Sequence, residues 1–205
     1  LNGETTTRII KGNEREHFEL QGSYLRVVGE LDRERVSKYN LTLQATDKGQ
    51  PARSSTNSLI VIVNDVNDHS PQFEFVTYHT ELSELAPLGS FVAGITATDN
   101  DTGLNAQLTY TILSGNDLEW FSIDQKTGLV TTIKKLDRET TSRVILKIEA
   151  KDGNLQQSRR SYTNITIEIW DENDEAPVFT SNTYSVTFTE GTRSGTEVTT
   201  VSATD

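Results

Sequence analysis

Apolar and polar residues alternate with a period of two along much of this chain. Residues 39–45, 144–150 and 165–169 carry an apolar side chain at every second position. This alternation is typical of a β-strand with one buried face and one face in water. Helical signals are weak by comparison, and threonine and serine are abundant. The pattern therefore predicts an all-β chain.

Short apolar runs separated by turn residues predict strands from one end of the chain to the other. We expect them at 8–10, 18–20, 25–27, 39–45 and 58–64, then at 78–85, 91–98, 108–113, 121–123, 129–133, 144–150 and 161–170, and finally at 184–190 and 198–205. Seven strands in just over a hundred residues, without a helix, predict a β-sandwich. The expected fold is a tandem array of seven-stranded Greek-key β-sandwiches with immunoglobulin-like topology.

An acidic cluster marks an internal repeat. Residues 65–69 (Asp-Val-Asn-Asp-His, the first linker) recur as residues 171–175 (Asp-Glu-Asn-Asp-Glu, the second linker), a spacing of 106 residues. A Leu-Asp-Arg-Glu motif at 31–34 recurs at 136–139, a spacing of 105. Acidic turns can arise by chance, but matching neighbours on both sides indicate repeated units. The expected units are 1–70, lacking its first strands, 71–176, which is complete, and 177–205, the first strands of a third.

The linkers concentrate carboxylate and amide oxygens, which are the ligands of a hard cation such as Ca²⁺. The length of the strands indicates at which end of a unit each of the other acidic residues lies, because a strand rises about 3.3 Å per residue. The 15 residues from Glu84 to Asp99 then span at most about 50 Å and place these two acids at opposite ends of one sandwich. The acidic residues are therefore expected to gather at the ends of the units, beside the linkers.

Composition narrows the possible functions. The chain has 205 residues, a formal net charge of −11 and a pI near 4.8, which argues against nucleic acid and anionic membranes as partners. It has no cysteine and no signal-peptide pattern. It also has no apolar run of about 18 residues, so we expect any membrane anchor to lie outside it.

Nothing in the sequence indicates catalysis. His17, His69 and His79 have no nucleophile at a useful spacing and are interpreted as surface residues, whereas Trp120 and Trp170 are expected to fill packing positions. Paired carboxylates could suggest a glycosidase, but these lie at unit ends rather than in a cleft. We therefore expect neither an enzyme nor a small-molecule substrate.

Five motifs in order give the chain its resemblance to a known family. Besides the linkers and Leu-Asp-Arg-Glu, they are Ala-x-Asp ending at Asp47 and Asp152, Asp-x-Asp-x-Gly-x-Asn at 99–105, and Pro-x-Phe after each linker. Together they resemble the extracellular cadherin repeat, and the loops are similar to those of the long Fat, Dachsous and protocadherin types. The resemblance covers the whole chain.

The resemblance implies three Ca²⁺ ions at each linker, held by residues carried over one by one. For the first linker it implies Asp32, Glu34, Asp65, the Val66 carbonyl, Asn67, Asp68, the His69 carbonyl, Asp99, Asp101, the Asn105 carbonyl and Asp152. For the second linker it implies Glu84, Asp137, Glu139, Asp171, the Glu172 carbonyl, Asn173, Asp174, the Glu175 carbonyl and Asp205. His69 and Glu175 depart from the asparagine usual at the last linker position, where a main-chain carbonyl serves.

The resemblance also implies a function and a location. The expected function is calcium-dependent cell–cell adhesion by an extracellular segment of a plasma-membrane protein, with another cadherin ectodomain on an apposed cell as partner. A structural spacer in a long cadherin and a calcium-dependent enzyme or carbohydrate-binding sandwich are the alternatives. Asn40 and Asn164 lie in N-glycosylation sequons on outward-facing strand positions. We also expect the parent chain to extend beyond both ends, with strand donation between molecules as the alternative.

Overall fold

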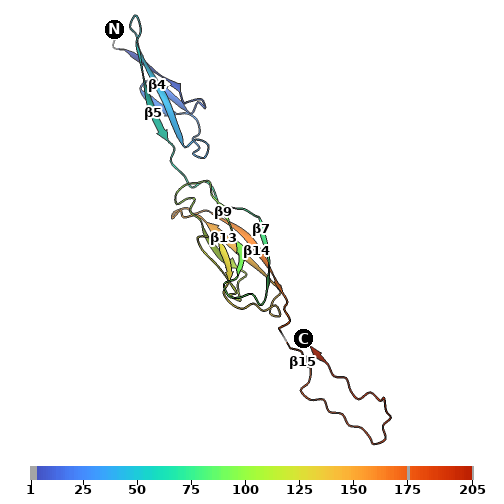
Figure 1. The fold of residues 1–205 in the computed structure, drawn as a ribbon. Coiled ribbons are helices and arrows are strands. Elements are labelled where there is room, and N and C mark those ends of the chain that lie inside the picture. The colour runs from blue at the N-terminus through green and yellow to red at the C-terminus, as the bar shows by residue number, and fades with distance from the viewer. Residues whose placement is uncertain (1–3, 175, 205) are drawn as a thin grey trace.

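The computed structural model describes residues 4–174 and 176–204. Figure 1 shows an elongated chain in which a small N-terminal sheet, a larger sandwich and a C-terminal loop follow one another. The described residues contain strands and turns and no helix. Consequently, no helix in this part of the chain is long and apolar enough to cross a membrane. The expected all-β class is confirmed.

The N-terminal part consists of a three-stranded sheet and a hairpin. The sheet has the order β1-β4-β5, from β1 (Thr5–Lys11), β4 (Lys38–Asp47) and β5 (Ser54–Ile62), and the hairpin pairs β2 (Phe18–Gln21) with β3 (Tyr24–Val27). All of these pairs are antiparallel. Phe18, Tyr39 and Leu41 are the buried centre of this part. Tyr39 and Leu41 are inward-facing positions of β4, along which buried and exposed residues alternate at this point.

The central part is a sandwich of two sheets. One has the order β10-β13-β14-β7, from β7 (Thr77–Ser83), β10 (Thr109–Ser114), β13 (Arg143–Lys151) and β14 (Arg160–Trp170); the other has the order β11-β12-β8, from β8 (Phe91–Gly94), β11 (Phe121–Ile123) and β12 (Leu129–Thr132). A short pair, β6 (Gln72–Phe73) with β9 (Ala97–Thr98), lies beside the first linker. β7 runs parallel to β14, and the other pairs are antiparallel. These two sheets form a β-sandwich, the fold class expected from the sequence.

Two glycines show how closely the first two units repeat each other. Gly12 and Gly115 both have a φ of +85°, and both follow an irregular register in the pairing of β1 or β10. A Cβ would lie 2.1 Å from the Asn40 carbonyl oxygen at Gly12, and 1.8 Å from the Ile145 carbonyl oxygen at Gly115. Only glycine combines this φ with so close an approach of backbone, so both bulges depend on it.

The core of the sandwich follows directly from the alternation of its two longest strands. Leu146 and Ile148 of β13 and Ile165 and Ile167 of β14 are fully buried, whereas Ile145 is 49% exposed. Burying an aliphatic side chain of this size contributes about 1.5–3 kcal/mol. These inward residues pack with Val92, Ile95, Trp120, Phe121 and Val130 of the facing layer.

The C-terminal part differs from expectation. Only β15 (Val178–Phe179) and β16 (Ala203–Thr204) pair there, and the strand expected at 184–190 is not formed. The strand expected at 198–205 is reduced to β16, and Asp205 lies outside the described residues. A strand needs a partner, and an isolated hairpin is marginal in water. Alternation in residues 184–190 therefore finds no sheet to join within the described chain.

The expectation for the two tryptophans is half right. Trp120 is 6% exposed and packs in the core, but Trp170 is 58% exposed. Trp170 is the last residue of β14 and follows the buried Ile169. Strict alternation turns its side chain outward, and its size does not override that register.

Core and surface positions on β13 provide the first prediction. Leu146→Ala should destabilise the protein by about 2–5 kcal/mol, because it removes buried methyl groups and leaves a cavity. The neighbouring Ile145→Ala change is the matched control and should cost less than about 1 kcal/mol, because its side chain is half exposed. Urea unfolding followed by circular dichroism measures both. Equal losses would contradict the assigned orientation of β13.

Candidate metal centre

The first linker is bound to the sandwich by hydrogen bonds from its asparagine. Asn67 Nδ2 donates to Asp152 Oδ2 at 2.9 Å and to the Gln157 carbonyl at 2.7 Å. In return, Arg159 Nε donates to the Asn67 carbonyl at 2.8 Å. These bonds join residues 85 to 92 positions apart in sequence and hold the linker against the loop that connects β13 with β14.

Asp65 connects the linker to the loop after β9. Its carboxylate accepts hydrogen bonds from Asn105 Nδ2 at 2.8 Å and from the Thr102 amide at 3.1 Å, and it pairs with the Arg33 guanidinium. Burial opposes ionisation, but the hydrogen bonds and the charge of Arg33 outweigh it and lower the pKa of Asp65. Asp65 is therefore a carboxylate at neutral pH.

Four possible ligands converge from three separate segments. One ligand atom from each of Glu34, Asp68, His69 and Asp101 lies within 4.8 Å of the others. Asp101 is 5% exposed, and burial is the main cause that raises the pKa of its carboxyl group. Burial also opposes a charged ring at His69, but hydrogen bonds with Asp101 and Asp68 outweigh this and raise the pKa of His69.

Two oxygens beside this group have no hydrogen-bond partner among the described residues. Asn67 Oδ1 and Asp99 Oδ2 are both buried, while Asp99 Oδ1 accepts from the Asp101 amide at 3.0 Å. A buried acceptor without a partner is costly. A hard cation satisfies such oxygens directly, so the donor set fits Ca²⁺.

Other residues expected at the first linker hold local turns. Asp32 accepts from the Arg35 amide and pairs with Arg35 Nε, both at 2.9 Å, and it is not part of the four-residue group. Asp152 is 2% exposed and accepts from the Asn154 amide at 2.9 Å and the Arg159 amide at 2.7 Å. The Val66 carbonyl accepts from the Asp68 amide at 2.8 Å, which bends the linker.

The second linker has a corresponding cluster built around Glu84. This residue is 3% exposed and accepts from the Arg138 amide at 2.9 Å and the Glu172 amide at 2.7 Å. One oxygen from each of Glu84, Asp137 and Glu139 lies within 4.8 Å of the others. The two backbone hydrogen bonds lower the pKa of Glu84. Hydrogen bonds from Thr140 likewise lower the pKa of Asp137.

The remaining residues of the second linker are more exposed. Asp171 pairs with Arg138 Nε at 3.1 Å, and the Asp174 amide donates to the Glu172 carbonyl at 2.8 Å, the same turn as in the first linker. Asn173 and Asp174 are exposed. Glu175 and Asp205, which were also expected here, lie outside the described residues.

Among the side chains at the linkers that sequence reasoning missed, three lie in the clusters or bind them directly. Arg33 contacts Glu34 and Asp65 and donates to the Asn100 carbonyl at 2.7 Å, so it joins the first unit to the second. Arg138 occupies the corresponding position at the second linker. The arginine of the repeated Leu-Asp-Arg-Glu motif was the available signal. The third is the His69 ring, because only the His69 carbonyl was expected to matter.

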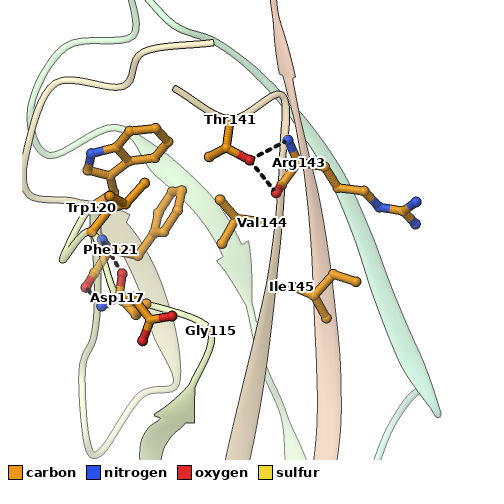
Figure 2. A pocket seen from close by; sticks show the side chains of 10 residues that line it. Gly115, Asp117, Trp120, Phe121, Thr141, Arg143, Val144 and Ile145 are labelled. Atoms are coloured by element: carbon orange, nitrogen blue, oxygen red, sulfur yellow. Dashed lines mark hydrogen bonds between the residues drawn. The ribbon is translucent and has the colours of Figure 1, made fainter. Parts of the chain in front are cut away.

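A separate cavity in the sandwich does not resemble an active site. It holds about 250 Å³ between the 115–121 loop and the start of β13, and Trp120, Phe121 and Val144 form its apolar wall (Figure 2). Ligand pockets usually measure about 300–1,000 Å³. Asp117 is the single carboxylate among its lining residues, whereas glycoside hydrolysis generally needs two.

Known proteins resemble the chain along its whole length. A family model described as Cadherin domain matches residues 1–64 and 78–170. The chain is 44% identical to protocadherin Fat 4 of Mus musculus over 220 residues, covering 100% of the chain and 4% of that protein. It is 37% identical to cadherin-23 of Mus musculus over 208 residues, covering 100% of the chain and 6% of that protein. The chain thus spans a small part of these relatives.

Solved structures resemble the fold as well. The crystal structure of mouse cadherin-23 EC22-24 has a TM-score of 0.86 and 29% identity, with 100% of this chain and 66% of that chain covered. The crystal structure of the protocadherin GammaB4 extracellular domain has a TM-score of 0.78 and 29% identity, with 89% of this chain and 30% of that chain covered. The resemblance expected from the motifs is confirmed.

Glu84 provides a prediction about pH. The pKa of Glu84 in the folded protein lies below the ordinary 4.5. The Glu84 carboxylate therefore stabilises the fold above pH 4.5, and this stabilisation is lost as the pH falls through the folded-state pKa. Glu84→Gln should lower the melting temperature near pH 7. The glutamine NH₂ group then faces one of the two backbone N–H groups, of Arg138 and Glu172, that donate to the carboxylate. The difference from the unchanged protein should shrink as pH falls below 4.5 toward the lowered folded pKa of Glu84.

The control is Glu81→Gln, an exposed position on the same strand β7. It should leave the melting temperature nearly unchanged at every pH. Scanning calorimetry in excess chelator measures all three proteins without a contribution from metal. A Glu84→Gln deficit that persists undiminished at the acid end would show that the carboxylate charge is not the cause.

Proposed function

Because the chain belongs to the cadherin family, we propose that it is a segment of a calcium-dependent adhesion ectodomain, made rigid by Ca²⁺ at its linkers. The observation that carries this proposal is the convergence of Glu34, Asp68 and Asp101 from different segments on one small volume. The division into units 1–70, 71–176 and 177–205 is part of the proposal. Each linker then joins the end of one unit to the start of the next.

The ligands of the first linker are proposed as a set. They are Asp32, Glu34, Asp65, Asn67, Asp68, Asp99, Asp101 and Asp152, with the carbonyls of Val66, His69 and Asn105. Seven of these residues are carboxylates, and three Ca²⁺ ions supply six positive charges. Arg33, which pairs with Glu34 and Asp65, supplies one more. The buried oxygens of Asn67 and Asp99 without partners support this assignment.

The second linker is proposed to bind Ca²⁺ in the same way. Its ligands are Glu84, Asp137, Glu139, Asp171, Asn173 and Asp174, with the Glu172 carbonyl and, outside the described residues, the Glu175 carbonyl and Asp205. The cluster of Glu84, Asp137 and Glu139 supports the assignment. So does the Asp174–Glu172 turn, which repeats the Asp68–Val66 turn of the first linker.

The mechanism of stiffening is electrostatic. Two carboxylates about 5 Å apart repel each other by about 3 kcal/mol at an effective dielectric constant near 20. Without a cation, the units lower this energy by moving apart about the linker. A bound Ca²⁺ turns the repulsion into shared coordination and needs oxygens from both units and from the linker. The result is a rod able to transmit force between cells.

Partner recognition is a property of whole ectodomains, and this chain spans a small part of its relatives' length. We propose a cadherin ectodomain on an apposed cell as partner, the same molecule or a related one, with the segment on the extracellular side of the plasma membrane. The alternative is a spacer segment with recognition elsewhere in the chain. Asn40 and Asn164 are exposed on β4 and β14, so both remain proposed N-glycosylation sites.

Calcium should therefore stabilise and straighten the 205-residue protein. We expect Kd values of about 10⁻⁴–10⁻³ M, the range of extracellular modules. Calcium at about a hundredfold excess over Kd contributes about 2.7 kcal/mol per independent site. The melting temperature and the radius of gyration from small-angle scattering should both be larger with calcium than with chelator. Identical values under both conditions would remove the basis of the proposal.

Two variants sharpen this experiment. Asp101→Ala should lose much of the calcium-dependent rise in melting temperature, because Asp101 is the buried member of the four-residue group. Asp47→Ala is the control, since Asp47 ends β4 at the far end of the first unit and accepts from the Gly49 and Arg53 amides at 3.0 and 2.8 Å. It should keep the calcium response even though its turn is weakened. Equal loss in both variants would contradict the assigned ligands.

The adhesive role needs a test on the longer ectodomain that contains this segment. Beads coated with that ectodomain should aggregate in calcium and disperse in chelator, because rigid rods present their binding surfaces across a gap. Beads carrying the Asp101→Ala ectodomain are the matched control and should aggregate less. Aggregation that is identical for both coatings would favour the spacer alternative for this segment.

A further inference from the structure

The ring of His69 lies inside the first cluster rather than beside it. Its Nδ1 atom is 2.8 Å from Asp68 Oδ1 and 3.1 Å from Asp101 Oδ1. With Glu34, these residues place three carboxylate oxygens and one imidazole nitrogen within 4.8 Å of one another. This nitrogen contributes nothing to an all-oxygen Ca²⁺ site.

Two distances within this group suit a small tetrahedral ion. Zn²⁺ binds histidine nitrogen and carboxylate oxygen at about 2.0–2.2 Å. Tetrahedral geometry with such bonds separates neighbouring donor atoms by about 3.3–3.6 Å. The two distances from Nδ1, 2.8 and 3.1 Å, need to lengthen by less than an ångström. Ca²⁺ instead takes six to eight oxygens at about 2.3–2.6 Å.

The cluster is also held in place before any ion arrives. The Asp101 side chain is fully buried, and its Oδ2 accepts from the His69 amide at 3.3 Å, which leaves Oδ1 facing the ring. Beside it, Asp99 Oδ2 is buried and has no hydrogen-bond partner among the described residues. The surroundings of Asp101 thus present more acceptors than donors, as a cation site does.

We propose that Glu34, Asp68, His69 and Asp101 form a binding site for a transition-metal ion of the Zn²⁺ class, and that this ion and Ca²⁺ exclude each other. Imidazole favours Zn²⁺ and its neighbours, whereas Ca²⁺ prefers oxygen. Exclusion follows because Glu34, Asp68 and Asp101 are also the proposed Ca²⁺ ligands. This second part rests on the proposed function, whereas zinc binding through His69 does not.

The second linker is an internal control. Its cluster contains Glu84, Asp137 and Glu139 and no histidine. The sequence has glutamate at position 175, where the first linker has His69. Among the described residues, the histidine-containing cluster therefore lies at the first linker, and one zinc ion is expected there for each chain.

The test uses the metal-stripped 205-residue protein and its His69→Asn variant. Asparagine keeps the main-chain carbonyl assigned to Ca²⁺ and removes the imidazole. Titration calorimetry with Zn²⁺ should show one site in the unchanged protein, weakened at least about tenfold in His69→Asn, since loss of even an outer-shell partner has that effect. Calcium should still bind the variant, because the main-chain carbonyl of residue 69 is retained. Zinc should weaken calcium binding in the unchanged protein and much less in the variant.

Two controls establish that the zinc site depends on the His69 ring and on its geometry. His79→Asn removes an exposed histidine on β7 and should leave zinc binding unchanged. Co²⁺ reports geometry, because a tetrahedral site containing nitrogen gives an intense visible absorption that should be absent in His69→Asn. Melting without metal checks that His69→Asn folds, and His69→Gln replaces it if it does not.

The outcomes separate the two proposals. Calcium binding to both proteins with equal zinc affinity in both would overturn the zinc site and leave the proposed function standing. Zinc binding that depends on His69, without any calcium binding, would overturn the proposed function and leave the zinc site standing. Zinc and calcium bound together at the first linker, each at undiminished affinity, would overturn their mutual exclusion.

Discussion

Repulsion between carboxylates that the fold forces together is the constraint on which both linkers depend. Strands of a sandwich end at its two poles, so acids at strand ends meet the linker that follows, as Asp101 meets Asp68 and His69. The protein moderates the repulsion with groups of its own. Backbone amides bind Glu84, and Arg33 pairs with Asp65 while donating to the Asn100 carbonyl. These contacts position the oxygens without neutralising all of them.

Most of the fold could be predicted because its determinants are local. Alternation located the long strands β4, β13 and β14, and repeated motifs at a nearly constant spacing located the linkers. The predictions failed where the structure of a segment depends on contacts with neighbouring segments. Residues 184–190 alternate as a strand does but have no neighbour to pair with in the described chain. Trp170 is large and aromatic, yet its position after Ile169 places it outside.

The site was less predictable than the fold, because ligation depends on side-chain direction as well as on sequence position. The motifs singled out Glu34, Glu84 and Asp101, which the structure places in the two acidic clusters. They gave no indication that Asp32 would pair with Arg35. Nor did they indicate the direction of the His69 ring, since its contacts come from Asp101, which is 32 residues away.

A repeat that keeps its backbone can still change its chemistry one side chain at a time. The turns Asp68–Val66 and Asp174–Glu172 are the same at 2.8 Å, so both linkers follow the same path. At the last linker position the proposed calcium ligand is only the main-chain carbonyl, which leaves the side chain free to vary. In the first linker that side chain is an imidazole pointing at two carboxylates. The proposed calcium coordination tolerates variation at this position, and that tolerance explains how an imidazole nitrogen can enter a cluster that otherwise contains only oxygens.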